Sequence, residues 1–147
     1  MPTRIYIPDR NEIGLVTAQP DNPAPGADLQ WPSPEMTRIL IHSIYFTLVT
    51  DANAANRRAC VEAYHGGTPF CMAPSPGHQV ASETIAYRFA PCILGIDESD
   101  DLAYMWAPMS GNLILEHVHA LYITVLNIQA TDQISAVKIR FYQKLPR

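Results

Sequence analysis

Apolar, β-branched and aromatic residues dominate the stretch from Met36 to Thr50, the longest such run in the chain. Successive side chains of a strand point to opposite faces, so the run divides its apolar side chains between two faces. One face would carry Leu40, Ile44, Phe46 and Leu48, and the other Ile39, Ile41, Tyr45 and Val49. Because neither face is polar, we predict a central strand with the core on the first face and a second contact on the other.

Seven further segments repeat a pattern of short strand and turn. They are residues 57–64, 68–72, 84–89, 102–106, 112–116, 121–128 and 134–143. No segment combines helix-capping residues with an apolar stripe of period 3.6. The pattern therefore predicts an all-β, antiparallel sandwich of about eight strands. A jelly roll is favoured over an immunoglobulin-like sandwich, because the connections vary in length and a Cys–Trp–Cys framework is missing.

Residues 1–35 differ from the rest of the chain, because they hold seven of the thirteen prolines. Proline lacks the amide donor and fixes φ, which excludes this region from central strands and helices. Two apolar pieces, at 5–7 and 13–16, could each pair at the edge of a sheet. We predict an extended N-terminal arm over residues 1–35 and a sandwich domain over residues 36–147.

The arm is either a flexible tail or a segment that becomes ordered by lying across a neighbouring subunit. Its apolar triplet Ile5, Tyr6 and Ile7, together with Trp31, favours the second alternative, because a simple linker rarely needs such residues.

Composition narrows the functional classes. Apolar residues make up 48% of the chain and charged residues only 16%, against about 25% in a typical soluble protein. Such a low charge density suggests that partner subunits cover part of the surface. With a net charge of −4 and no cluster of Lys and Arg, we expect no direct binding of nucleic acid. The chain has neither an 18-residue apolar run nor a signal-like apolar N-terminus, so we expect no membrane span and assembly in a cytoplasm.

The candidate chemistry is sparse. Cys60, Cys71 and Cys92 are odd in number and widely spaced, which is typical of free thiols rather than of a zinc or redox motif. The acidic run at 97–101 lacks the ligand spacing of a calcium loop, so we interpret it as a solvated turn. Motifs for an activated nucleophile or a phosphate loop are also missing, and we predict that the protein is not an enzyme.

His117 and His119 are the strongest candidate metal ligands, because residues two apart on a strand share a face. Their spacing from Gly111 matches the start of the first cupin motif. The glutamate expected shortly after is absent from residues 120–124, and neither glycine nor histidine follows His119. We therefore predict ordinary histidines, no metal site and no cofactor, and keep a metal-dependent cupin-like enzyme as a third alternative.

The segment from Trp31 to Pro91 resembles small structural proteins encoded in the virion gene clusters of tailed bacteriophages. The resemblance rests on an ordered set of pieces: Trp31-Pro32, Ser43–Thr50, Ala55–Arg58, a Gly-Gly turn, Pro76, Gln79–Ser82 and Tyr87–Pro91. It implies a non-enzymatic virion component, and jelly-roll cement or decoration proteins, which staple capsid shells, fit best. Such a protein is assembled in the host cytoplasm and lies on the capsid surface.

The expected partners are the major capsid protein and copies of the chain itself, in a trimer or dimer. Residues expected to contact these partners are Ile5, Tyr6, Ile7, Trp31, Ile39, Ile41 and Tyr45. The main alternative is a tail, neck or head–tail connector component, or a β-sandwich that binds a receptor or glycan. In that case Tyr104 and Trp106 would contact the sugar or a neighbouring ring protein.

Overall fold

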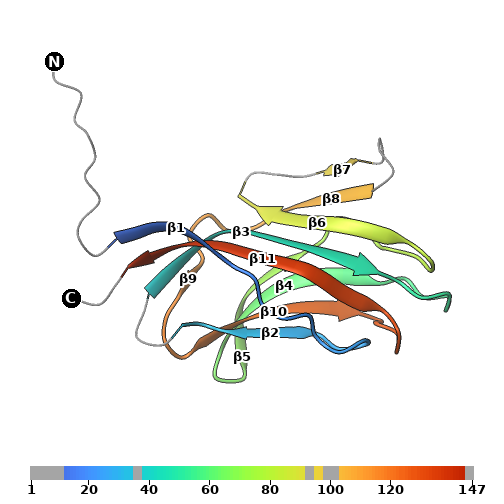
Figure 1. Ribbon diagram of the computed structural model, residues 1–147, viewed down its shortest axis with the longest axis horizontal. Coiled ribbons are helices and arrows are strands. Elements are labelled where there is room, and N and C mark those ends of the chain that lie inside the picture. Colours follow the sequence, from blue (N-terminus) through green and yellow to red (C-terminus); the bar gives the residue numbers. More distant parts are fainter. Residues whose placement is uncertain (1–11, 35–37, 92–94, 98–102, 145–147) are drawn as a thin grey trace, which may run out of the picture.

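The computed structural model describes residues 12–34, 38–91, 95–97 and 103–144 of the 147-residue chain. These residues form eleven strands (Figure 1), which confirms the all-β prediction. In this described part, no helix has the length and hydrophobicity needed to cross a membrane.

The strands form two sheets. The larger sheet has the order β1 (Glu12–Ala18), β11 (Gln133–Lys144), β3 (Arg38–Val49), β6 (Thr84–Ala90), β8 (Ala103–Pro108) and β7 (Gly95–Asp97), with β9 (Ile114–Leu115) paired to the start of β3. The smaller sheet has the order β2 (Leu29–Pro32), β10 (His119–Leu126), β4 (Arg58–His65) and β5 (Thr68–Pro74).

The two sheets share one hydrophobic core, an arrangement that is compatible with a β-sandwich (Figure 1). From the larger sheet come large rings, with Phe46 stacked on Tyr87 at a centroid distance of 5.0 Å. The smaller sheet contributes aliphatic side chains such as Leu121 and Ile123, together with the small Ala59 and Ala63.

Each of the eight segments expected to be a strand contains one, and β1, β2 and β7 are additional. The apolar piece at 13–16 forms the edge pairing expected of it, as part of β1 beside β11. One pairing differs from the antiparallel expectation, since β8 runs parallel to β6. The chain passes through β7 between β6 and β8. Because β7 pairs antiparallel with the other edge of β8, β8 runs in the same direction as β6.

The proline-rich connector between β1 and β2 is fastened to the loop between β10 and β11. The Gly26 amide donates to the Asp132 carbonyl at 2.8 Å, and Gln133 Nε2 donates to the Pro23 carbonyl at 2.9 Å. Gly26 has φ +74°, and a Cβ there would lie 2.9 Å from the Ala130 carbonyl oxygen, so only glycine fits. The segment at 12–34, expected to belong to an arm, thus supplies an edge strand to each sheet.

The central strand β3 corrects the predicted division of its faces. Ile39 and Ile41 are each 1% exposed and lie in the same core as Ile44, whereas Leu40 is half-buried on the outer side. Phe141 pairs with Ile41 and the adjacent Arg140 with Ser43, so His42 is an extra residue in β3. Such a β-bulge shifts the alternation by one residue and turns the first part of the strand over. The prediction that Ile39 and Ile41 lie on the outer face is wrong for this reason.

A buried ion cluster holds the loops at one end of the sandwich. The fully buried Arg57 donates from Nε and Nη2 to the two carboxylate oxygens of Asp132, at 2.9 and 3.0 Å. Nη2 also donates to Asp51 Oδ1 at 2.7 Å, and Nη1 donates to the carbonyls of Asn53 and Ala55. All five N–H groups of the guanidinium are therefore satisfied, as a buried charge requires.

Asp132 is the acidic centre of this cluster. Burial alone would raise its pKa, but hydrogen bonds from Arg57 and from the backbone amides of Asp51 and Gln129 outweigh burial and hold the pKa below 3.8. A carboxyl with a lowered pKa adds stability above its ordinary pKa, and this contribution is lost as the pH falls below that value.

We expect Arg57→Met to lower the free energy of unfolding by about 3–5 kcal/mol, because it leaves the Asp132 carboxylate buried without its countercharge. Urea denaturation at neutral pH measures this loss. The matched control is Arg38→Met, whose pair with Glu116 is exposed on both sides and should cost at most about 1 kcal/mol. Equal losses in the two variants would contradict the central role of the cluster.

We further expect wild-type protein to lose stability more steeply than Asp132→Asn as the pH falls below 3.8. The physical reason is that the unfolded wild-type chain takes up a proton at this carboxyl at a higher pH than the native state does, and Asp132→Asn removes this difference. Urea titrations at several pH values measure the two slopes, and parallel slopes would count against the lowered pKa.

Candidate functional site

A row of alternating cationic and aromatic side chains crosses the outer face of the larger sheet. Lys138 on β11 is the register partner of Tyr45 on β3, and Tyr45 is the partner of Arg88 on β6. Arg88 is in turn the partner of Trp106 on β8. Side chains of paired residues on one face of a sheet lie next to each other, so four strands align these groups in one line.

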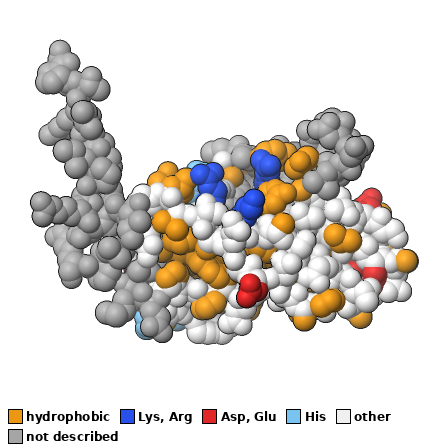
Figure 2. Space-filling model, in the orientation of Figure 1, with side chains coloured by type: hydrophobic (Ala, Val, Ile, Leu, Met, Phe, Trp, Pro, Cys, Tyr) orange, Lys and Arg blue, Asp and Glu red, His pale blue; other side chains and the backbone are white. Residues whose placement is uncertain are grey.

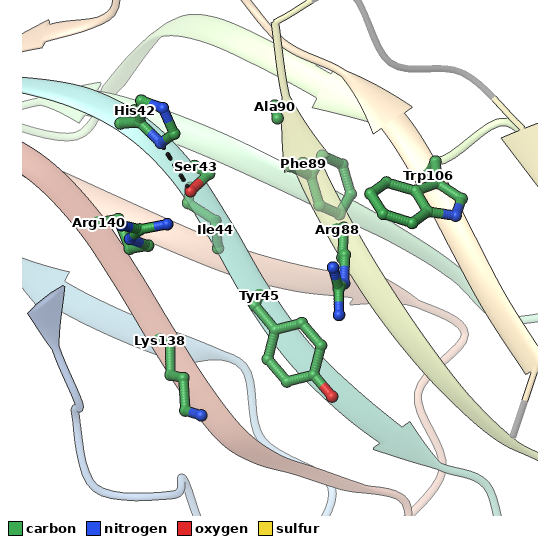
Figure 3. Close-up of a pocket in the computed structure, with 10 residues that line it drawn as sticks. All are labelled: His42, Ser43, Ile44, Tyr45, Arg88, Phe89, Ala90, Trp106, Lys138 and Arg140. Atoms are coloured by element: carbon green, nitrogen blue, oxygen red, sulfur yellow. Dashed lines mark hydrogen bonds between the residues drawn. The ribbon is translucent and has the colours of Figure 1, made fainter.

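Arg88 is the centre of the row, and Figure 3 shows its guanidinium between the rings of Tyr45 and Trp106. The guanidinium carbon lies 4.9 Å from the centroid of Trp106, 5.3 Å from Tyr45 and 5.5 Å from Tyr104. Lys138 Nζ lies 5.9 Å from the Tyr45 ring on the other side. These distances fall within the range of cation–π attraction, which holds flexible side chains in place while leaving their charge at the surface.

The row borders a groove with a volume of about 440 Å³. Its lining comprises His42, Ser43, Ile44, Tyr45, Arg88, Phe89, Ala90, Trp106, Lys138 and Arg140. A second hollow of about 310 Å³, lined largely by apolar residues such as Leu40, Pro91 and Tyr142, adjoins it, because His42 and Ala90 line both. Figure 2 shows Lys and Arg gathered among hydrophobic side chains on this face, with the visible Asp and Glu side chains set apart from them.

The groove lies where β3 changes its neighbour on one side. Beyond Ile44 and Phe89, β3 leaves β6, and the start of β3 pairs instead with β9. His42 and Ser43 lie between these two pairings, with the His42 Nδ1 3.0 Å from the Ser43 hydroxyl oxygen. The missing neighbour strand at this point leaves an opening in an otherwise continuous sheet.

The structure brings only one of the predicted partner-binding residues into the groove. Tyr45 lies in its centre. Ile39 and Ile41 are buried in the core, and Trp31 packs there against Phe141 at a centroid distance of 5.6 Å. Ile5, Tyr6 and Ile7 lie outside the described residues.

Arg88, Lys138 and Arg140 were not among the residues predicted to contact a partner. Alternation with period two in residues 84–89 and 134–143 puts them opposite the apolar side chains of their strands, and all three are exposed. The local pattern does not reveal that β11, β3 and β6 are neighbours in the sheet. This neighbourhood places the cations around Tyr45.

The histidines of the cupin-like spacing are arranged differently from a shared metal pair. His117 is exposed in the turn before β10, whereas His119 lies beside His65, with His119 Nε2 3.2 Å from His65 Nδ1. His119 Nδ1 accepts a hydrogen bond from the Glu116 amide at 2.9 Å, so neutral His119 carries its proton on Nε2 and donates it to His65. Within the described part of the chain, no group of three or more His, Cys, Asp and Glu side chains could hold a metal ion.

Cys60 and Cys71 are free, half-buried thiols. Burial and the neighbouring Glu62 carboxylate raise the pKa of Cys60 to about 11, so the protonated form dominates at neutral pH. A protonated thiol is a poor nucleophile. The groove, by contrast, offers fixed positive charge and aromatic surface, which are suited to binding rather than to bond making.

No protein-family model, curated protein or solved structure matches the chain.

We expect the ratio of the iodide to the caesium quenching constant for Trp106 to be roughly twice the ratio for free N-acetyltryptophanamide, because the cations of the groove concentrate anions near the indole. The measurement uses a Trp31→Phe background, in which Trp106 is the remaining tryptophan. Arg88→Gln should lower this ratio toward that of the free indole, whereas Arg38→Gln, outside the groove, should leave it unchanged. A ratio no higher than that of the free indole in the parent protein would contradict a positive groove.

Proposed function

We propose that this protein is a non-enzymatic structural protein of a tailed-bacteriophage virion, namely a capsid cement or decoration protein with a jelly-roll fold. It stabilises the head shell by bridging major capsid subunits and associates with copies of itself as a trimer or dimer. The proposal joins the resemblance of residues 31–91 to phage structural proteins with the strand pairing of the fold.

The strand pairing is the observation that carries the proposal. If β7, β8 and β9 are set aside as an insertion, eight strands remain, and they pair from the outside inward: β1 with β11, β2 with β10, β3 with β6, and β4 with β5. This nested order, first with last and second with second-last, is the one obtained by rolling a long antiparallel hairpin into two sheets. It supports a jelly roll, the architecture of many viral capsid and lectin domains.

The outer face of the larger sheet supports a role in docking. Arg88, Lys138 and Arg140 are exposed, and aromatic contacts hold Arg88 and Lys138 in position. Rigid, pre-ordered side chains lose little entropy on binding, which suits a protein that must staple a shell through many identical contacts.

A second candidate function is that of a tail, neck or head–tail connector component, or of a β-sandwich that binds a receptor or glycan. It is favoured by Tyr104 and Trp106, whose rings flank Arg88 on the same face. Aromatic rings beside a polar group are a common platform for the apolar face of a sugar.

Copy number in purified virus particles separates these two functions. A shell protein should approach the copy number of the major capsid protein, whereas a tail or neck protein should reach only a small fraction of it. Quantitative mass spectrometry of the particles measures this ratio. Absence of the chain from particles would overturn both.

We expect Tyr45→Lys to abolish binding to undecorated shells while changing the free energy of unfolding by less than about 1 kcal/mol. Tyr45 lies on the outer face and contributes little to the core, but it holds Arg88 and Lys138. Cosedimentation with shells and urea denaturation measure the two effects. A variant that failed to fold, or one that still decorated shells at full strength, would argue against this role.

We also expect deletion of residues 1–11 to weaken shell binding, because it removes the apolar residues Ile5, Tyr6 and Ile7. It should spare the fold, because β1 begins at Glu12 and keeps its pairing with β11. The same two assays apply. A deletion of residues 1–34 is the contrasting variant, since it removes an edge strand from each sheet and should prevent folding.

A further inference from the structure

We propose that the groove around Tyr45 binds an extended, acidic peptide segment of a partner protein. The inference goes beyond the proposed function, because it concerns the chemistry of the ligand and holds for any partner, capsid subunit or not. It rests on the charge, spacing and shape of the groove.

Charge is the first argument. Three exposed cations, Arg88, Lys138 and Arg140, line the groove, and none of its described lining residues carries a carboxylate. Among the described residues, no Asp or Glu forms an ion pair with any of them. This concentration of positive charge occurs in a chain with a net charge of −4. Cations grouped in this way are complementary to an anionic ligand, and guanidinium groups form strong charge-assisted hydrogen bonds with carboxylates.

Spacing is the second argument. Lys138 and Arg140 are two residues apart on β11, which places them about 6.8 Å apart along one face. An extended peptide also repeats each face about every 6.8 Å, so carboxylates at positions i and i+2 match these two cations. Arg88 lies across β3 on β6, about two strand spacings or 9.6 Å from β11. One extended chain fits between the two sides, above Tyr45.

The adjoining hollow is the third argument. Leu40, Pro91 and Tyr142 give it an apolar lining, and His42 and Ala90 join it to the cationic part. A peptide lying along β3 would place its acidic side chains on the cations and a following apolar side chain in this hollow. The groove thus favours two acidic residues, spaced i and i+2, next to an aliphatic one.

A nucleic acid is a less suitable occupant. Proteins that bind nucleic acids carry a broad excess of Lys and Arg, because each backbone phosphate needs neutralising. Here three cations occupy one groove of an acidic chain, and a long polyanion would meet repulsion from the rest of the surface. A short acidic peptide would not, since screening limits its interactions to within about 8 Å at physiological ionic strength.

The test uses the purified full chain and a fluorescein-labelled, capped peptide in which two glutamates two residues apart precede a leucine. We expect fluorescence anisotropy to give a Kd roughly tenfold lower for this peptide than for the matched peptide with glutamines. Rising salt should abolish the difference. Arg140→Gln and Arg88→Gln should each weaken binding of the glutamate peptide roughly tenfold, at an unchanged melting temperature.

Arg38→Gln is the matched control, because Arg38 is likewise an exposed cation of the larger sheet. It lies on β3, outside the groove. It should leave the Kd unchanged. Equal affinity for the two peptides, or an equal loss in Arg38→Gln and Arg140→Gln, would overturn the inference. Tighter binding of a single-stranded oligonucleotide of equal charge, lost in Arg140→Gln, would also overturn it and assign the groove to nucleic acid. Because copy number in particles is measured separately, failure here is distinguishable from failure of the virion proposal.

Discussion

The buried ion pair between Arg57 and Asp132 is the constraint on which one end of this fold depends. A fully buried guanidinium is tolerated only when every donor is matched, and here the matching groups come from loops far apart in the sequence. Backbone hydrogen bonds between Arg57 and Gln79 bring in a third loop, and Gln79 accepts a hydrogen bond from Tyr87 in the core. The β3–β4, β5–β6 and β10–β11 connections are therefore fixed to one another as well as to the sheets. A β protein without a helix among its described residues obtains rigid loops in this way.

Whereas the ion pair fixes the loops, the bulge in β3 interrupts the regular register of the larger sheet. One extra residue at His42 turns Ile39 and Ile41 into the core. At the same point β3 changes its neighbour on the other side from β6 to β9, and His42 and Ser43 lie between these two pairings. The interruption produces a groove, and the row of Lys138, Tyr45, Arg88 and Trp106 lies along it because four strands are held in register. Bulges often occur where a sheet must present a binding surface.

The cationic and aromatic side chains of the groove are the basis for proposing that the protein acts by binding a partner. Cation–π contacts fix Arg88 without neutralising it, so the positive charge is both ordered and available. Groups that could carry bond-making chemistry are arranged differently: the His119 ring is hydrogen-bonded to the His65 ring, and the Cys60 thiol is protonated at neutral pH. The nested strand pairing and the phage-like sequence pattern then suggest where such an association surface would be used, on a shell built from many identical subunits.

The local pattern of the sequence predicts eight of the eleven described strands. Alternation with period two is a local property, and it puts Ile85, Tyr87 and Phe89 on one face of their strand and Val137, Ile139 and Phe141 on one face of theirs. All six are buried in the core. The tertiary structure alone decided the face of Ile39 and Ile41, because one bulged residue reverses the alternation without changing composition. The tertiary structure also brought the residues of the candidate site together. Arg88, Tyr45 and Lys138 are distant in the chain, and only the register between β6, β3 and β11, set by packing of the whole core, places them side by side.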